Sequence, residues 1–163
     1  MLIRNLWILF IMFFVGGSML SAQDIDYIGA AKCKVCHNKT AKGAQYKQWL
    51  GTRHAKAMES LSPEEAQDPN CIKCHATAAT VDEDLIVGLK MSEGVSCESC
   101  HGPGGKYKTN SIMKSREESI ANGLILPTEE VCRKCHNSES PTFKGFDFEE
   151  SFKKITHPMP VQE

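Results

Sequence analysis

Apolar residues are concentrated at the start of the chain and form only short, irregular runs in the rest of it. The longest later stretch with a helical pattern covers residues 38–61, with a break expected near Gly51. Residues 81–91 have an ambiguous pattern that a short strand would also fit, but no regular alternation of apolar and polar residues predicts a sheet. The sequence therefore predicts a mainly α fold of short helices and loops, with little or no β-sheet. Further helices are expected to begin where a Ser, Thr or Asp precedes acidic residues, at Ser62, Ser115, Thr128 and Asp147.

The apolar run at the N-terminus has the features of an export signal. Arg4 precedes it, the run is too short to span a bilayer comfortably, and small residues follow it as far as Ala22. This pattern predicts a signal peptide over residues 1–22 and a mature domain over residues 23–163, exported to the periplasm. An uncleaved membrane anchor is the alternative, because Leu20 is a poor residue at the third position before the cleavage site.

Length and charge narrow the class of protein only a little. Across 163 residues, 19 Lys and Arg oppose 20 Asp and Glu, for a net charge of −1. The length is that of one compact domain. No basic cluster suggests a nucleic-acid partner.

All eight cysteines occur in C-x-x-C pairs, and a histidine follows each pair directly. C-x-x-C-H is the attachment motif of c-type haem. On a helical turn the three side chains share one face, so the thiols can bond one haem edge while the histidine ligates the iron. The sequence therefore predicts four haem c cofactors, with the cysteines as thioether anchors and the histidines as proximal ligands. The anchors are Cys33, Cys36, Cys71, Cys74, Cys97, Cys100, Cys132 and Cys135, and the proximal ligands are His37, His75, His101 and His136.

Disulfide bonds and zinc sites are the two alternatives to haem attachment at these cysteines. Disulfides are common in small exported proteins, and four C-x-x-C pairs would also complete two four-cysteine zinc sites. Neither alternative explains why a histidine follows every pair. Haem attachment is therefore the preferred interpretation.

Four haems would take up much of the volume of so short a chain. The mature domain provides about 35 residues per haem, and a globule of this length has a radius of gyration of about 14 Å. We therefore expect four closely packed haems at the centre of the fold, with the short helices and loops wrapped around them.

Two histidines, His54 and His157, remain after the proximal ligands are assigned. Both are predicted as distal ligands, because few residue types can fill the second axial position of haem iron. Methionine is the next candidate, and Met113 is preferred because it lies in a polar loop with no obvious packing role. Tyr107 is a rarer type of ligand, and an open, five-coordinate iron is a further alternative.

Three stretches of the chain resemble one known family. They are DYIGAAKCKVCHNKTAKGAQYKQWLGTRHAKAM at 26–58, PNCIKCHATA at 69–78 and GVSCESCHGPGGKY at 94–107. They are similar to exported tetrahaem cytochromes c, a family typified by the tetrahaem electron acceptor of hydroxylamine oxidoreductase. The most specific part is the Gly-Pro-Gly after the third motif, together with Val95 and Glu98.

The resemblance implies a mostly helical protein that stacks its haems in close pairs and passes electrons between enzymes. It also implies that His54 is a distal ligand. Many relatives have a histidine after the Gly-Pro-Gly, where this chain has Lys106 and Tyr107. That departure argues against one bis-histidine haem, and favours Met113 or an open iron at that site.

The expected function is electron transfer between redox protein partners by a periplasmic multihaem cytochrome c. The alternative is a small haem enzyme that acts on a nitrogen oxide, hydroxylamine or peroxide at a five-coordinate haem. Such an enzyme needs proton donors, and Lys106 and Tyr107 are the nearest candidates. A third interpretation is a subunit of a haem-bearing filament, or a partner of a membrane-bound oxidoreductase.

Overall fold

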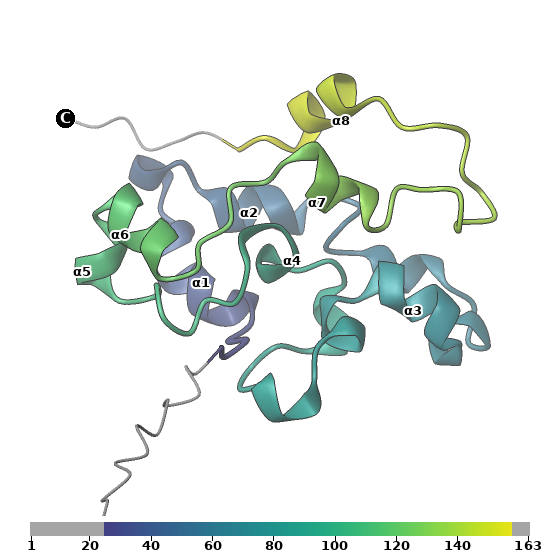
Figure 1. Cartoon of the computed structure of the whole chain (residues 1–163), viewed down its shortest axis with the longest axis horizontal. Helices are drawn as coiled ribbons and strands as arrows, with labels where there is room; N and C mark the ends of the chain where they lie inside the picture. The colour runs from purple at the N-terminus through teal and green to yellow at the C-terminus, as the bar shows by residue number, and fades with distance from the viewer. Residues whose placement is uncertain (1–24, 158–163) are drawn as a thin grey trace, which may run out of the picture.

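The computed structural model describes residues 25–157, and the predicted signal peptide lies outside them. Short α-helices joined by loops and single 3₁₀ turns make up this part of the chain (Figure 1), which confirms the mainly α fold class. The α-helices are α1 (Ala30–His37), α2 (Gln45–Leu50), α3 (Pro69–His75), α4 (Cys97–His101), α5 (Asn110–Met113), α6 (Arg116–Ala121), α7 (Glu129–Arg133) and α8 (Phe148–Ile155). The 3₁₀ turns are η1 (Thr40–Lys42), η2 (Ala57–Ser60), η3 (Glu65–Gln67), η4 (Thr77–Thr80), η5 (Glu83–Leu85) and η6 (Met91–Glu93).

The helix starts predicted at Ser115, Thr128 and Asp147 are confirmed, whereas no α-helix begins at Ser62. Ser115 Oγ accepts the backbone N–H of Glu118 at 3.1 Å at the start of α6, and Asp147 accepts that of Glu150 at 2.8 Å at the start of α8. Thr128 immediately precedes α7. Ser62 and Glu65 form a reciprocal capping box, with N–H to side-chain oxygen distances of 2.8 and 3.2 Å. That box starts only the single turn η3.

The prediction that most of residues 38–61 is helical, with a break near Gly51, is only partly confirmed. The stretch folds as η1, α2 and η2, with interruptions before and after α2. Gly43 and Ala44 both adopt left-handed backbone conformations, with φ of 91° and 48°, and a right-handed helix cannot continue through them. The break expected near Gly51 is confirmed, because Gly51 caps the C-terminus of α2.

The strand that residues 81–91 could have formed is reduced to one bridge. Tyr27 N–H donates to Leu85 O at 2.8 Å, and Val87 N–H donates to Tyr27 O at 3.0 Å. Together they make an isolated parallel bridge between Tyr27 and Ile86. No sheet forms within residues 25–157.

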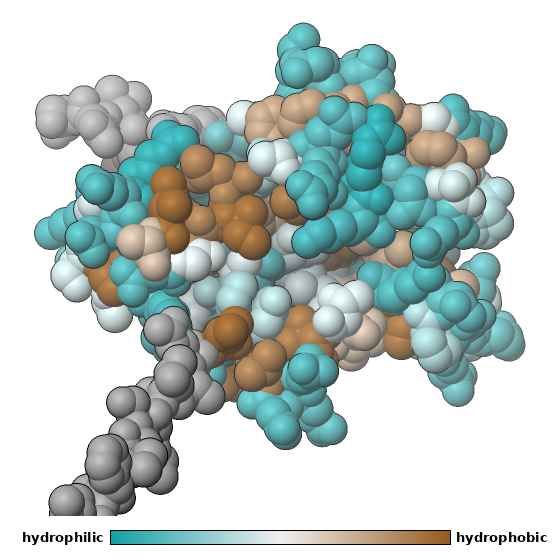
Figure 2. Space-filling model, viewed as in Figure 1, coloured by the Kyte–Doolittle hydropathy of each residue, from teal (hydrophilic) through white to brown (hydrophobic). Residues whose placement is uncertain are grey.

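Few apolar side chains are buried in the described part of the chain. They are Ile28, Ala30, Ala76, Leu89 and Tyr107. By contrast Val35 and Val87 are 70% and 65% exposed, and apolar residues gather on the face drawn in Figure 2. Because a polypeptide of this size ordinarily buries a larger apolar core, this distribution fits a fold whose centre is completed by cofactors.

Buried polar contacts hold the segments together instead. The side chain of Glu98, in α4, is 3% exposed and accepts three backbone N–H groups. The donors are Ile28 at 2.9 Å, Gly29 at 2.9 Å and Gly104 at 2.7 Å. Glu93 accepts the next N–H, that of Ala30, at 2.9 Å. Two carboxylates beside the third motif therefore anchor the N-terminus of α1, which carries the first motif.

Gly29 is the point of closest approach at this anchor. Its φ is +77°, a conformation that residues with a side chain rarely adopt. A Cβ atom there would lie 2.4 Å from Gly88 O. Only glycine therefore allows the chain to reach both Glu98 and the 85–88 segment.

Candidate functional site

Each of the four C-x-x-C-H motifs lies on a helical turn. The first three belong to α1, α3 and α4, and the fourth begins in α7. Although α7 ends at Arg133, His136 N–H still donates to Cys132 O at 3.0 Å, which continues the helical hydrogen-bond pattern. All eight cysteines are free. The paired thiols and the adjoining histidine therefore share one side of a turn, as haem attachment requires.

Two of the predicted proximal histidines are held in the tautomer that can bind iron. His75 Nδ1 lies 2.8 Å from Ala57 O, and His101 Nδ1 lies 3.2 Å from Ile125 O. A carbonyl oxygen only accepts hydrogen bonds, so both Nδ1 atoms carry the proton. The lone pair of each Nε2 is then available for a metal ion, in the second-coordination-shell arrangement that metal-bound histidines commonly have.

The ring of His136 is oriented by stacking. Phe146 lies parallel to it, with a centroid distance of 4.7 Å and an interplanar angle of 14°. The guanidinium of Arg133 lies 5.6 Å from the centroid of the Phe146 ring. These contacts restrict the rotation of the fourth proximal histidine.

The rings of His54 and His157, the two remaining histidines, each lie close to the ring of a predicted proximal ligand. The ring centroids of His54 and His136 are 6.0 Å apart, and those of His101 and His157 are 5.8 Å apart. A metal–imidazole bond is about 2.0 Å and the ring centre lies about 1.1 Å behind the nitrogen, so two imidazoles on one metal ion have centres about 6 Å apart. Both pairs therefore have the separation of two axial ligands on one iron.

The environment of the two distal candidates favours the neutral form that binds metal. Burial lowers the pKa of His54, and the neighbouring His136 lowers it further. Burial also lowers the pKa of His157. The backbone of His54 is fixed as well, because its carbonyl accepts the N–H of Val95 at 2.9 Å.

The cysteines show which attachment sites are neighbours. The thiols of Cys33 and Cys97 interact, and this contact lowers the pKa of Cys33 and raises that of Cys97. Burial, and then the adjacent Cys132, raise the pKa of Cys100 to about 11.

The second site adjoins the fourth in the same way. Burial, and then the nearby thiol of Cys74, raise the pKa of Cys135 to about 11. These contacts join the first site to the third, the third to the fourth and the fourth to the second. Figure 1 shows α1, α4, α7 and α3 in that order along the longest axis of the molecule.

Tyr107 has a structural role. It is 8% exposed, and its hydroxyl lies 2.9 Å from Gly102 O and 3.1 Å from His101 O, so it donates to the backbone that follows the third motif. Burial, as the largest cause, raises the pKa of Tyr107. The hydroxyl is therefore engaged with carbonyl oxygens, which does not suit an iron ligand or a proton donor.

Met113 is the last residue of α5 and is half-buried. The α5 helix packs on α6. Its assignment as a ligand stays a prediction.

The Gly-Pro-Gly-Gly after the third motif packs against the start of the described chain. Gly104 N–H binds Glu98, and Gly105 N–H donates to Asp26 O at 2.9 Å. A Cβ atom on Gly105 would lie 2.7 Å from that of Asp26. The glycines therefore allow a close approach to residues 26–28.

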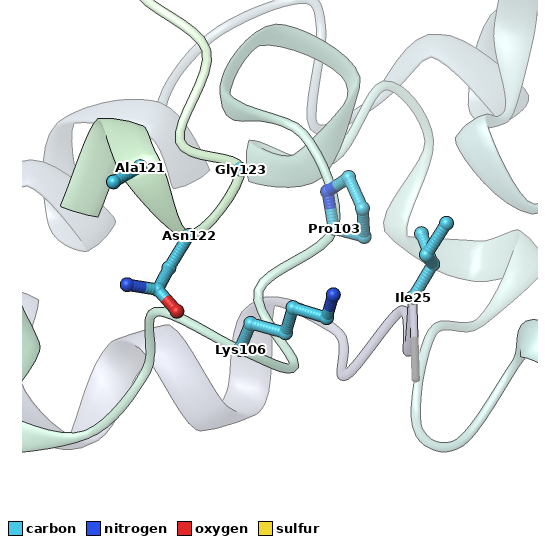
Figure 3. A pocket seen from close by; sticks show the side chains of 6 residues that line it. All are labelled: Ile25, Pro103, Lys106, Ala121, Asn122 and Gly123. Atoms are coloured by element: carbon cyan, nitrogen blue, oxygen red, sulfur yellow. The ribbon is translucent and has the colours of Figure 1, made fainter. Parts of the chain in front are cut away.

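A cavity of about 510 Å³ lies beside this turn. It is lined by Ile25, Pro103, Lys106, Ala121, Asn122 and Gly123. Figure 3 shows Lys106 extending beneath Pro103, across from the end of α6. Among the described residues that line it, Lys106 is the one that is ionisable.

Residues 25–157 contain neither a membrane-spanning helix nor a cluster of potential metal ligands. No helix there is long and apolar enough to cross a membrane. The same residues form no cluster of three or more His, Cys, Asp and Glu side chains of the kind that the zinc alternative needs.

Comparison with known proteins agrees with the haem-attachment geometry. Residues 32–102, which include the first three motifs, match the family model of cytochrome c554 and c-prime. The chain is 32% identical over 154 residues to cytochrome c-554 of Nitrosomonas europaea. The match covers 76% of this chain and 63% of that protein. No solved structure matches the chain significantly.

Proposed function

We propose that this chain is a member of the cytochrome c554 family, which its first three motifs match, and that it carries electrons between redox protein partners. Haem c is its cofactor, at four attachment sites, and each haem iron takes up and releases one electron. The observation that carries the proposal is the pair of opposed histidines at two of the sites, 6.0 and 5.8 Å apart.

We assign the distal ligands from this geometry. His54 would complete the iron site of His136, and His157 would complete that of His101. With both axial positions filled by imidazoles on a fixed backbone, these two sites need little rearrangement when the charge of the iron changes. Such rigidity suits electron transfer and leaves no room for a substrate at either iron.

The first and second sites differ from these two. All six histidines of the chain are then in use, so no histidine is left to oppose His37 or His75. Met113 remains the proposed ligand for one of these irons, and the other is expected to be open.

The order of the sites supports transfer along a line. Adjacent cysteines link the first site to the third, the third to the fourth and the fourth to the second. The outer two sites, on α1 and α3, are then the ones placed to exchange electrons with partners.

We propose that the protein works in the periplasm after removal of residues 1–22. Association with a membrane-bound oxidoreductase is compatible with this role. The function rests on the attachment sites of the mature domain and does not require a membrane-spanning helix in it.

Electron transfer and catalysis can be separated with the purified holoprotein. We expect electron paramagnetic resonance to show two bis-imidazole low-spin haems, and we expect all four haems to reoxidise together when a soluble oxidant is added. Hydroxylamine, nitric oxide and peroxide should not be turned over. Sustained turnover of any of them would replace the proposal with the enzyme alternative.

A further inference from the structure

Although the net charge is only −1, two segments of the chain are strongly charged. Residues 27–58 contain seven Lys and Arg and no Asp or Glu, whereas residues 59–84 contain seven Asp and Glu and a single Lys. The seven cations of the first segment and the seven anions of the second are all exposed. The cations are Lys32, Lys34, Lys39, Lys42, Lys47, Arg53 and Lys56, and the anions are Glu59, Glu64, Glu65, Asp68, Asp82, Glu83 and Asp84.

Neither set is neutralised within the described part of the chain. Its ion pairs are Lys73–Glu139, Arg133–Glu129 and Lys154–Glu150, and none of them involves the fourteen residues. Lys73, the one cation of the acidic segment, is bound to Glu139 at 2.7 Å. Both segments therefore present their charge to the solvent.

Parts of the two segments lie at the two ends of the haem-site order. Residues 27–47 of the basic segment include α1, which carries the first site, and residues 59–68 of the acidic segment lead directly into α3, which carries the second. The acidic residues 82–84 lie instead beside Tyr27, whose N–H donates to Leu85 O at 2.8 Å. Figure 1 shows α1 and α2 in one half of the molecule along its longest axis and α3 in the other. Haem propionates add the same charge at every site, so they leave this contrast unchanged.

We propose that the two ends of the haem line dock redox partners of opposite charge. The basic surface of residues 27–47 receives a protein with an acidic face at the first site. The acidic surface of residues 59–68 receives a protein with a basic face at the second site. This inference rests on the proposed electron-transfer function, and it separates the donor and the acceptor in space.

The physical basis is electrostatic steering. A patch of like charges raises the encounter rate of an oppositely charged reactant by about 10- to 1000-fold at low salt and repels a reactant of the same sign. One partner would be attracted to one end and repelled from the other. Electrons would then enter and leave at different haems, and the two partners would not compete for one surface.

Small redox complexes of opposite charge can probe the two ends separately. The reduced holoprotein is mixed in a stopped-flow instrument with ferricyanide, an anion, or with tris(phenanthroline)cobalt(III), a cation. One variant combines Lys39→Gln, Lys42→Gln and Lys47→Gln, and a second combines Glu59→Gln, Glu64→Gln and Glu65→Gln, three exposed carboxylates that precede α3. A matched control combines Lys90→Gln, Lys144→Gln and Lys153→Gln, three exposed lysines outside the basic segment.

The two variants should respond in opposite ways. At an ionic strength of about 0.01 M, where the screening length is about 30 Å, the lysine variant should lose about tenfold in its rate with ferricyanide and keep its rate with the cobalt complex. The acidic variant should show the reverse. The control should change neither rate by more than about twofold, and high salt should remove all of these differences.

Each result either supports or overturns the inference. It is overturned if both variants change both rates alike, or if the control behaves as the lysine variant does. The completeness of reoxidation tests the proposed function in the same trace. Incomplete oxidation in the unaltered protein would reject electron transfer along the line, whereas complete oxidation at charge-independent rates would reject only the docking ends.

Discussion

Replacing one carboxylate oxygen of Glu98 by an amide nitrogen should destabilise the fold. One of its carboxylate oxygens, Oε1, accepts the N–H groups of Ile28 and Gly104, and the other accepts that of Gly29. In Glu98→Gln an amide oxygen can keep the first two bonds. The amide nitrogen then faces the N–H of Gly29, so two donors oppose each other and one buried N–H loses its partner.

The magnitude follows from these three bonds. Losing a charge-assisted bond to a buried N–H costs about 2 kcal/mol, and converting the other two to neutral bonds costs about 1 kcal/mol more. We therefore expect Glu98→Gln to lower the free energy of unfolding by about 3 kcal/mol. With an m-value of about 4 kcal/mol/M, the guanidinium midpoint should fall by about 0.7 M.

Guanidinium unfolding of the holoprotein, followed by circular dichroism, measures this shift. Intact mass must first show that the variant carries the same number of haems. The control is Glu64→Gln, which removes an exposed carboxylate and should change the free energy of unfolding by less than about 0.5 kcal/mol. If the two variants have the same midpoint, the carboxylate of Glu98 does not anchor α1.

Three other changes test the assignments at the sites. His54→Ala should convert one low-spin haem to high spin, and adding His157→Ala should convert a second; an unchanged resonance spectrum would rule out the histidine pairs. Tyr107→Phe removes a buried hydroxyl donor, so it should cost about 1 kcal/mol in guanidinium unfolding and leave every spin state as it was, whereas a new high-spin signal would make Tyr107 a ligand after all. Met113→Ala should abolish any absorption band near about 695 nm, the region where methionine-ligated ferric haem absorbs; a band that persists would remove Met113 from the ligand set.

The features that the sequence predicts well are those set by covalent chemistry or by local hydrogen bonds. Two thiols and one histidine must have fixed spacing to hold one haem, so the four attachment turns are evident without a structure. A capping side chain acts over three residues, so the starts of α6 and α8 are equally evident. The error over residues 38–61 is also local, because nothing in the apolar pattern shows that Ala44 adopts a left-handed conformation.

The proposed pairing of distal with proximal ligands could not be predicted from local spacing. His54 and His136 come from distant segments, and their opposition depends on how the intervening chain folds. The role of Glu98 was equally hidden, since an acidic residue between two cysteines in a polar segment looks solvent-exposed. Only the resemblance to tetrahaem cytochromes singled it out, and it did so without a physical reason.

The carboxylate anchor and the charged ends of the molecule are parts of one arrangement. A partner that docks on the basic surface pushes directly on α1, the helix that carries the first site. In an ordinary domain an apolar core would resist that force, but few apolar side chains are buried here. Glu98 and Glu93 instead tie the N-terminus of α1 to the turn of the third site through three N–H groups. We therefore expect a docked partner to leave the position of the first site relative to the third unchanged.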